Sequence, residues 1–138
     1  MIEIKSSLEG KQAVLSGLKS KLEGLGYTVG GNWDYDHGYF DYKLDEGEEE
    51  QYLRIPITAL DGDLEQENTR VELGRPFMLS HEYKTDVDVD GNVGNVSASL
   101  NQFREPSDKD APFPKKFIEM GVVLVKNTET ELLNEKII

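Results

Sequence analysis

The sequence lacks cysteine altogether, and this absence removes several classes of chemistry. Without thiols the chain forms no disulfide, no thiolate nucleophile, no cysteine-based zinc site and no iron–sulfur cluster. Long apolar runs are also missing: the longest covers residues 122–125, whereas a membrane-spanning helix needs about 20 apolar residues. The N-terminus does not show the basic start and apolar run of a signal peptide. The sequence therefore predicts a cytoplasmic protein with no membrane association.

Positive charge is scarce as well. Fifteen Lys and Arg stand against 27 Asp and Glu, which gives a formal net charge of −12. This field repels a phosphate backbone, and no basic patch offsets it, so we expect no nucleic-acid partner. The excess is concentrated in residues 34–50, which hold eight acids and one lysine. A charged partner is therefore expected to be a cation or a basic protein.

The chain has 138 residues, which is enough for one domain with its own core. Four leucines recur at helical spacing: Leu15, Leu18, Leu22 and Leu25. Ser6 and Glu9 form a capping-box pattern ahead of them, and Gly26 follows the last leucine. These signals predict an amphipathic helix over residues 8–25. A second helix is expected over residues 114–136, although its β-branched part at 122–125 is also compatible with a strand.

Alternating patterns predict strands between the two helices. A turn at His37-Gly38 would make a hairpin with these cross-strand pairs: Tyr35 with Phe40, Trp33 with Tyr42, and Asp34 with Asp41. The last pair opposes two like charges and needs a Lys or Arg, a cation or a different register. Residues 51–60 predict another strand, which Pro56 places at a sheet edge or a bulge. Residues 71–73 and 77–83 are also extended, and a second hairpin is expected around Asp90-Gly91.

We therefore predict an α+β fold formed by residues 1–138 as a single domain. It consists of one antiparallel sheet of about five to six strands, with an N-terminal and a C-terminal helix packed on one face. The leucines of the first helix are expected to pack on these sheet residues: Trp33, Tyr35, Phe40, Leu53, Ile55 and Ile57.

Three runs of the sequence resemble the YugN-like family of Bacillus and relatives. They are residues 31–43 (GNWDYDHGYFDYK), 52–56 (YLRIP) and 100–106 (LNQFREP), and they occur in the same order as in that family. The resemblance covers nearly the whole chain. It implies a small α+β cytoplasmic protein of Gram-positive bacteria, and it assigns no catalytic, cofactor-binding or metal-binding residue.

Two groups of side chains are candidates for a cation site. The first comprises Asp34, Asp36, His37 and Asp41, which could hold a divalent ion through two carboxylates and an imidazole. The second comprises Asp86, Asp88 and Asp90, which precede Gly91 as in a calcium loop. The twelfth position of that loop is Ser97 rather than the Glu that calcium requires. A solvated acidic face and an ordinary hairpin are the simpler explanations, and we favour them.

Signals for catalysis are weak. His81 falls on an apolar strand face, where a histidine is more often a hydrogen-bonded core residue than a ligand. The sequence contains no G-x-S-x-G elbow, P-loop or G-x-G-x-x-G fingerprint. It therefore favours a small acidic non-enzymatic binding or regulatory protein without a cofactor, with a protein or small molecule as its partner. The alternative is a metal-dependent or small-ligand-binding protein that uses the acidic hairpin cluster.

Overall fold

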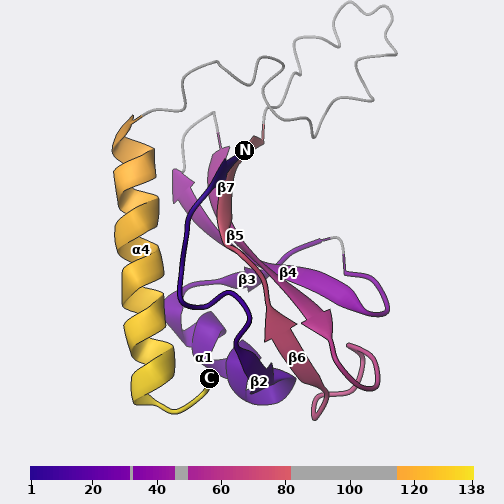
Figure 1. Cartoon of the computed structure of the whole chain (residues 1–138). Coiled ribbons are helices and arrows are strands. Elements are labelled where there is room, and N and C mark those ends of the chain that lie inside the picture. The colour runs from indigo at the N-terminus through magenta and orange to yellow at the C-terminus, as the bar shows by residue number, and fades with distance from the viewer. Residues whose placement is uncertain (32, 46–49, 82–114) are drawn as a thin grey trace, which may run out of the picture.

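The computed structural model of the chain is an α+β fold with one open antiparallel sheet and two helices (Figure 1). It describes residues 1–31, 33–45, 50–81 and 115–138. The helices are α1 (Leu15–Leu25) and α4 (Lys115–Asn134). The seven strands are β1 (Ile2–Glu3), β2 (Gln12–Val14), β3 (Thr28–Val29), β4 (His37–Asp45), β5 (Glu50–Ala59), β6 (Arg70–Leu73) and β7 (Phe77–His81). The predicted fold class is confirmed, although the sheet contains more strands than expected.

Strand β5 lies at the centre of the sheet. The order is β1-β7-β5-β4-β3, and β6 joins β5 to β2. The register pairs Phe40 with Ile55 and Tyr42 with Leu53 across β4 and β5. Because side chains alternate along a strand, Leu53, Ile55 and Ile57 share the face that carries Phe40. This face holds the core.

The expected edge position of Pro56 is wrong, because β5 is the central strand. Its first half pairs with β7 up to Arg54, and its second half pairs with β6 from Ile57. Pro56 lies where β5 changes partner, and its carbonyl accepts a hydrogen bond from the Gly74 amide at 2.8 Å. The nitrogen of a strand residue points to the same side as its carbonyl, so the Pro56 nitrogen faces the break between β6 and β7. No sheet hydrogen bond is lost there.

The first helix is shorter than predicted and begins at Leu15 rather than Leu8. The Ser6 hydroxyl accepts from the Leu8 amide at 2.9 Å, but this closes a turn and not a helix. Gly10 then takes a φ of 88°, and residues 12–14 pair with β6. Strand pairing satisfies these backbone groups better than a helix interrupted by glycine would. The predicted end of the helix is confirmed, since Gly26 caps it at a φ of 111°.

The hairpin predicted at His37-Gly38 is also wrong. Strand β4 pairs with β3 through Val29 and Phe40, and residues 33–36 lie in the connection that leads into β4. Trp33 still reaches the core edge: its indole N–H donates to the Tyr39 carbonyl at 2.9 Å, and its ring meets Phe40 edge-on at 5.6 Å. A Cβ on Gly38 would lie 2.6 Å from the indole. The glycine is therefore needed for the packing of Trp33 and not for a turn.

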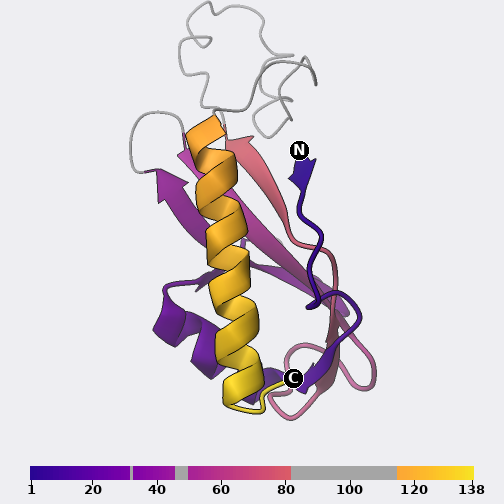
Figure 2. The same cartoon turned by 60° about the vertical axis from the view of Figure 1, so that its left-hand side comes forward.

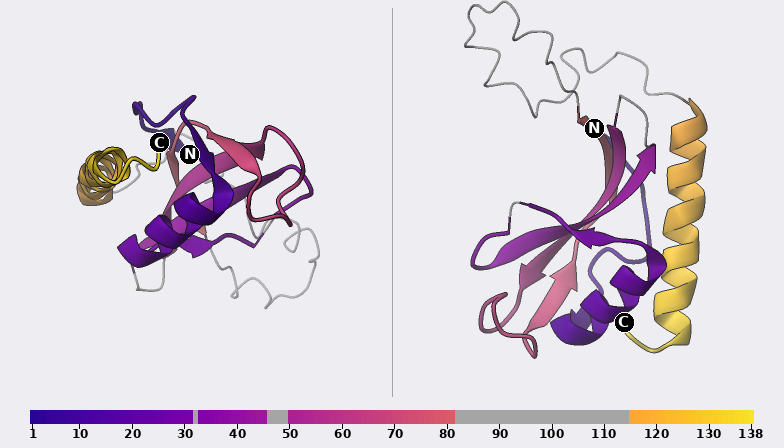
Figure 3. Two further views of the ribbon diagram at one scale, coloured as in Figure 1. Left: turned by 90° about the horizontal axis from the view of Figure 1, so that it is seen from below. Right: turned by 180° about the vertical axis from the view of Figure 1, so that it is seen from behind.

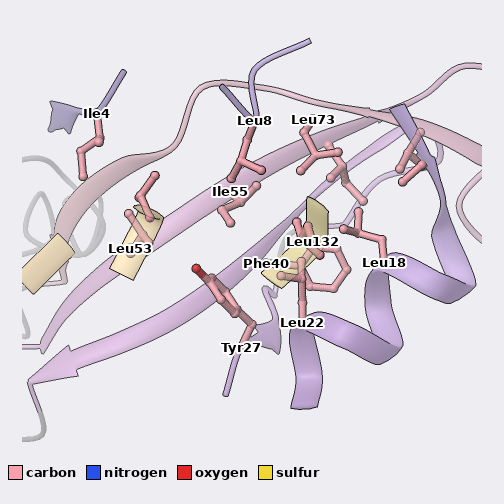
Figure 4. Close-up of a cluster of buried hydrophobic side chains, with 14 of the residues drawn as sticks. Ile4, Leu8, Leu18, Leu22, Tyr27, Phe40, Leu53, Ile55, Leu73 and Leu132 are labelled. Atoms are coloured by element: carbon pink, nitrogen blue, oxygen red, sulfur yellow. The ribbon is translucent and has the colours of Figure 1, made fainter. Parts of the chain in front are cut away.

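Both helices cover the same face of the sheet, as predicted (Figures 2 and 3). Residues 122–125 are helical and belong to α4. The buried positions of α4 recur every three or four residues: Phe117, Gly121, Val125, Thr128 and Leu132. In Figure 4, Leu18 and Leu22 of α1 and Leu132 of α4 gather around Phe40. Of the expected core, Tyr35 is the exception, with 69% of its surface exposed.

Some predictions lie outside the described residues. These are the second hairpin around Asp90-Gly91 and its three aspartates, Asp86, Asp88 and Asp90. Within the described ranges, no helix is long and apolar enough to cross a membrane.

Gly121 sets how closely α4 approaches the sheet. A Cβ there would collide with the Met78 sulfur and lie 3.3 Å from Ile4. We expect Gly121→Leu to lower the free energy of unfolding by about 2 kcal/mol or more, because the buried site has no room. Urea unfolding followed by circular dichroism measures this. Gly24→Leu is the matched control, since a Cβ at Gly24 meets nothing within 4 Å. Equal stability of the two variants would contradict the close packing of α4.

Tyr27, which follows α1 and its cap Gly26, is joined to α4 by a buried hydrogen bond. Thr128 Oγ1 donates to the Leu124 carbonyl, so the Tyr27 hydroxyl donates to Thr128 over 2.8 Å. Burial of the phenol raises the pKa of Tyr27 above its ordinary value. The neutral phenol therefore contributes its full stabilisation of the folded state below the unfolded pKa of about 10. This contribution is lost as pH rises above that value.

We therefore expect Tyr27→Phe to be less stable than the parent by about 1 kcal/mol at pH 8. This stability difference should shrink as pH rises above about 10. There the phenol ionises in the unfolded parent but stays neutral in the folded parent, so the parent loses stability and the Phe variant does not. Urea unfolding of both proteins across this range checks the prediction. A difference that stays constant with pH would contradict it.

Candidate functional site

Two acidic loops meet at one end of the sheet (Figure 1). They are the β3–β4 loop and the β5–β6 loop. The Ala59 amide donates to the Asp36 carbonyl at 2.8 Å, and the Leu64 amide donates to the Tyr35 carbonyl at 3.1 Å. These bonds place residues 33–37 against residues 59–70. We call this combined surface the acidic end.

The acidic end carries six acids and one arginine. The acids are Asp34, Asp36, Asp61, Asp63, Glu65 and Glu67, and the arginine is Arg70. Two of the acids also shape their own loop: Asp61 accepts from the Arg70 amide and Asp63 from the Glu65 amide. Nothing in the sequence indicated that the two loops would meet, because the contact is made by backbone groups.

His37 lies between two carboxylates within the acidic end. Its Nε2 is 3.1 Å from Asp34 Oδ2, and its Nδ1 is 2.9 Å from Asp36 Oδ1. All three side chains are exposed. The carboxylates bind different ring nitrogens, so they approach the imidazole from different sides. A metal ion binds a histidine through one nitrogen, and no single position there meets all three groups.

Asp41, the fourth member of the predicted cluster, lies elsewhere, on the sheet face opposite the core. Its two oxygens accept from Arg54 Nε at 2.8 Å and Nη2 at 3.0 Å. Both side chains are nearly buried, with 11% and 12% of their surfaces exposed. The Arg54 guanidinium also lies 4.6 Å from the centre of the Tyr39 ring. The expected opposition of Asp34 and Asp41 is thus absent: Asp41 pairs with Thr28 in the sheet and with Arg54 through its charge.

The four residues of the first candidate site therefore do not come together. Across residues 1–31, 33–45, 50–81 and 115–138, no group of three or more His, Asp or Glu side chains is arranged to hold a metal ion. The sequence analysis did not predict that Asp41 forms an ion pair with Arg54. The two residues are register partners on the adjacent strands β4 and β5, and no register between these strands was predicted.

Two apolar side chains project from the acidic end. Tyr35 is 69% exposed and Leu60 is 42% exposed. They flank the Ala59–Asp36 hydrogen bond, one on each loop. An exposed aromatic and an exposed leucine surrounded by carboxylates form a surface that combines contact area with charge.

Comparisons with known proteins identify a family and several relatives that are similar to this chain. The profile of the YugN-like family matches residues 3–132. The uncharacterized protein YugN of Bacillus subtilis (strain 168) is 40% identical over 97% of this chain and all of that protein. The uncharacterized protein YlbA of the same organism is 35% identical over 60% of this chain and 69% of its own length. A crystal structure of the uncharacterized conserved protein YugN from Geobacillus kaustophilus HTA426 superposes with a TM-score of 0.70. It covers 99% of this chain and 98% of that one at 21% identity, which shows a shared fold.

The Asp41–Arg54 pair makes a testable contribution to stability. Asp41→Asn keeps the shape of the side chain but removes the negative charge that faces the nearly buried guanidinium of Arg54. We expect the variant to lose about 2 to 4 kcal/mol of unfolding free energy, since the two charged hydrogen bonds between these side chains are weakened. Urea unfolding at pH 7 measures the loss. Asp34→Asn is the control, because this exposed residue should change stability by less than about 1 kcal/mol. Similar small losses in both variants would show that the pair is not structural.

Proposed function

We propose that this chain, which belongs to the YugN-like family, is a single-domain, cytoplasmic, non-enzymatic binding protein that takes a basic protein partner at its acidic end. The observation that carries the proposal is that backbone hydrogen bonds join the β3–β4 loop, which holds Tyr35, to the β5–β6 loop, which holds Leu60. Two segments distant in the sequence bring six acids and two exposed apolar side chains onto one surface.

The chemistry of the acidic end supports a protein partner. Tyrosine is enriched among the residues that contribute most to protein–protein binding, because it offers a large rigid surface with a polar tip. Carboxylates around such an anchor speed the encounter with a basic protein and disfavour acidic ones. The loops project from the sheet, and projecting loops suit contact with another macromolecule better than enclosure of a small molecule.

The state of His37 supports a binding role rather than catalysis. Both of its ring nitrogens contact carboxylates of its own loop, and the Asp34 amide donates to the His37 carbonyl at 2.7 Å. The imidazole thus shapes the loop that presents Tyr35. The cytoplasmic location rests on the absence of cysteine, which suits a reducing compartment.

Site-specific photocrosslinking tests the proposal. A photoreactive phenylalanine placed at Tyr35 or Leu60 in Bacillus subtilis cells should give a covalent adduct with a basic protein, identified by mass spectrometry. The same group at Val123, which is exposed on α4, is the matched control and should not give this adduct.

Binding of the identified protein is then measured with purified components. We expect Tyr35→Ala to weaken it at least about tenfold, as for a central aromatic anchor. Its affinity should also fall as sodium chloride is raised, because the acidic end acts through exposed charges. The proposal fails if the adduct also forms at Val123, if the partner is acidic, or if Tyr35→Ala binds like the parent.

A further inference from the structure

A polar hollow of about 400 Å³ lies beside α4, in a different part of the molecule from the acidic end. Three segments line it: residues 5–9, Arg75 between β6 and β7, and the α4 residues Lys126 and Glu129. These segments lie far apart in the sequence, so the hollow exists only in the folded chain.

Hydrogen bonds fix the walls of this hollow. Glu129 Oε2 accepts from the Ser6 hydroxyl at 2.7 Å and from the Ser7 amide at 3.1 Å. Glu9 Oε1 accepts from Arg75 Nε at 2.9 Å. Both carboxylates of the lining are therefore engaged with groups of the protein. Such supported walls hold their shape when a ligand enters.

Two lysines of the lining differ from these carboxylates, because no ion pair holds their side chains in the described part of the chain. Within the part of the chain that the structure describes, neither Lys5 nor Lys126 forms an ion pair, whereas Lys21 binds Glu131 at 3.1 Å. The third cation of the lining, Arg75, binds Glu9 at 2.9 Å and Glu3 at 3.3 Å. Lys5 and Lys126 are therefore the positive groups of the hollow that are left for a ligand. Unpaired lysines beside fixed carboxylates and serines are the groups expected of an anion-binding hollow.

We infer that this hollow binds a small anionic molecule that carries a phosphate or carboxylate group together with hydroxyl or amino groups. The lysines neutralise the anionic group, since an ammonium acts as a point charge toward phosphate and carboxylate alike. The carboxylates of Glu9 and Glu129 accept from the hydroxyl or amino groups. The volume suits a metabolite at the small end of the usual range for ligand sites, roughly 300–1,000 Å³. This inference is independent of the proposed protein partner.

Titration with defined probes tests the inference. We would add sn-glycerol 3-phosphate, malate or glycerol to the full chain at constant ionic strength, and follow backbone amides by NMR. Saturable shifts at Ser7 are expected with at least one of the two anions and not with glycerol, and binding of both would show that the hollow accepts either anionic group. Binding of glycerol 3-phosphate but not malate identifies phosphate as the recognised group, and the reverse result identifies carboxylate.

Variants separate the hollow from general charge attraction. Lys126→Gln and Lys5→Gln should each weaken binding of the anion at least about tenfold, the effect of losing one charged hydrogen bond. Lys115→Gln is the matched control, because Lys115 is exposed on the same helix outside the hollow, and its affinity should equal that of the parent. Thermal melting verifies that all three variants fold. The inference is overturned if neither anion saturates by about 10 mM, or if the three variants weaken binding equally.

Discussion

The fold depends on strand β5 having neighbouring strands on both of its sides. Its first half pairs with β7 and its second half with β6, while β4 covers the other edge throughout. A strand enclosed in this way has one face to bury, and Leu53, Ile55 and Ile57 fill it. Both helices then pack on that face. The change of partner at Pro56 matters because β5 there needs no amide hydrogen bond toward β6 or β7, so a proline fits without loss of a sheet bond.

Periodic segments were the most predictable part of the structure. The leucines of α1, the alternation of β5 and the apolar stripe of α4 each gave the correct element, because one buried face leaves a regular pattern in the sequence. The prediction of a helix over residues 8–14 failed for a physical reason. Its residues satisfy their backbone groups through β6, a partner about 60 positions away that no local signal could reveal.

The candidate site shows the same limit. The aspartates and His37 were recognised by their residue types, but their grouping depended on a hairpin that does not form. Asp41 lies on the predicted face of its strand, next to Arg54, whereas Asp34 and Asp36 precede β4 in a loop and lie beside His37. Tyr35 was expected in the core for the same reason. The contact between the β3–β4 and β5–β6 loops, which forms the acidic end, involves main-chain bonds that any residues could make.

The position of α4 also has a consequence for synthesis of the chain. The bonds from Ser6 to Glu129 and from Tyr27 to Thr128 span 123 and 101 residues, so they form only when the last helix has been made. At a typical rate of roughly 5–20 residues per second, more than about two seconds separate the completion of β7 from that of α4. During this interval α1 can pack on the apolar sheet face around Phe40, but α4 cannot yet do so. An apolar face left uncovered for seconds makes the incomplete chain prone to aggregation.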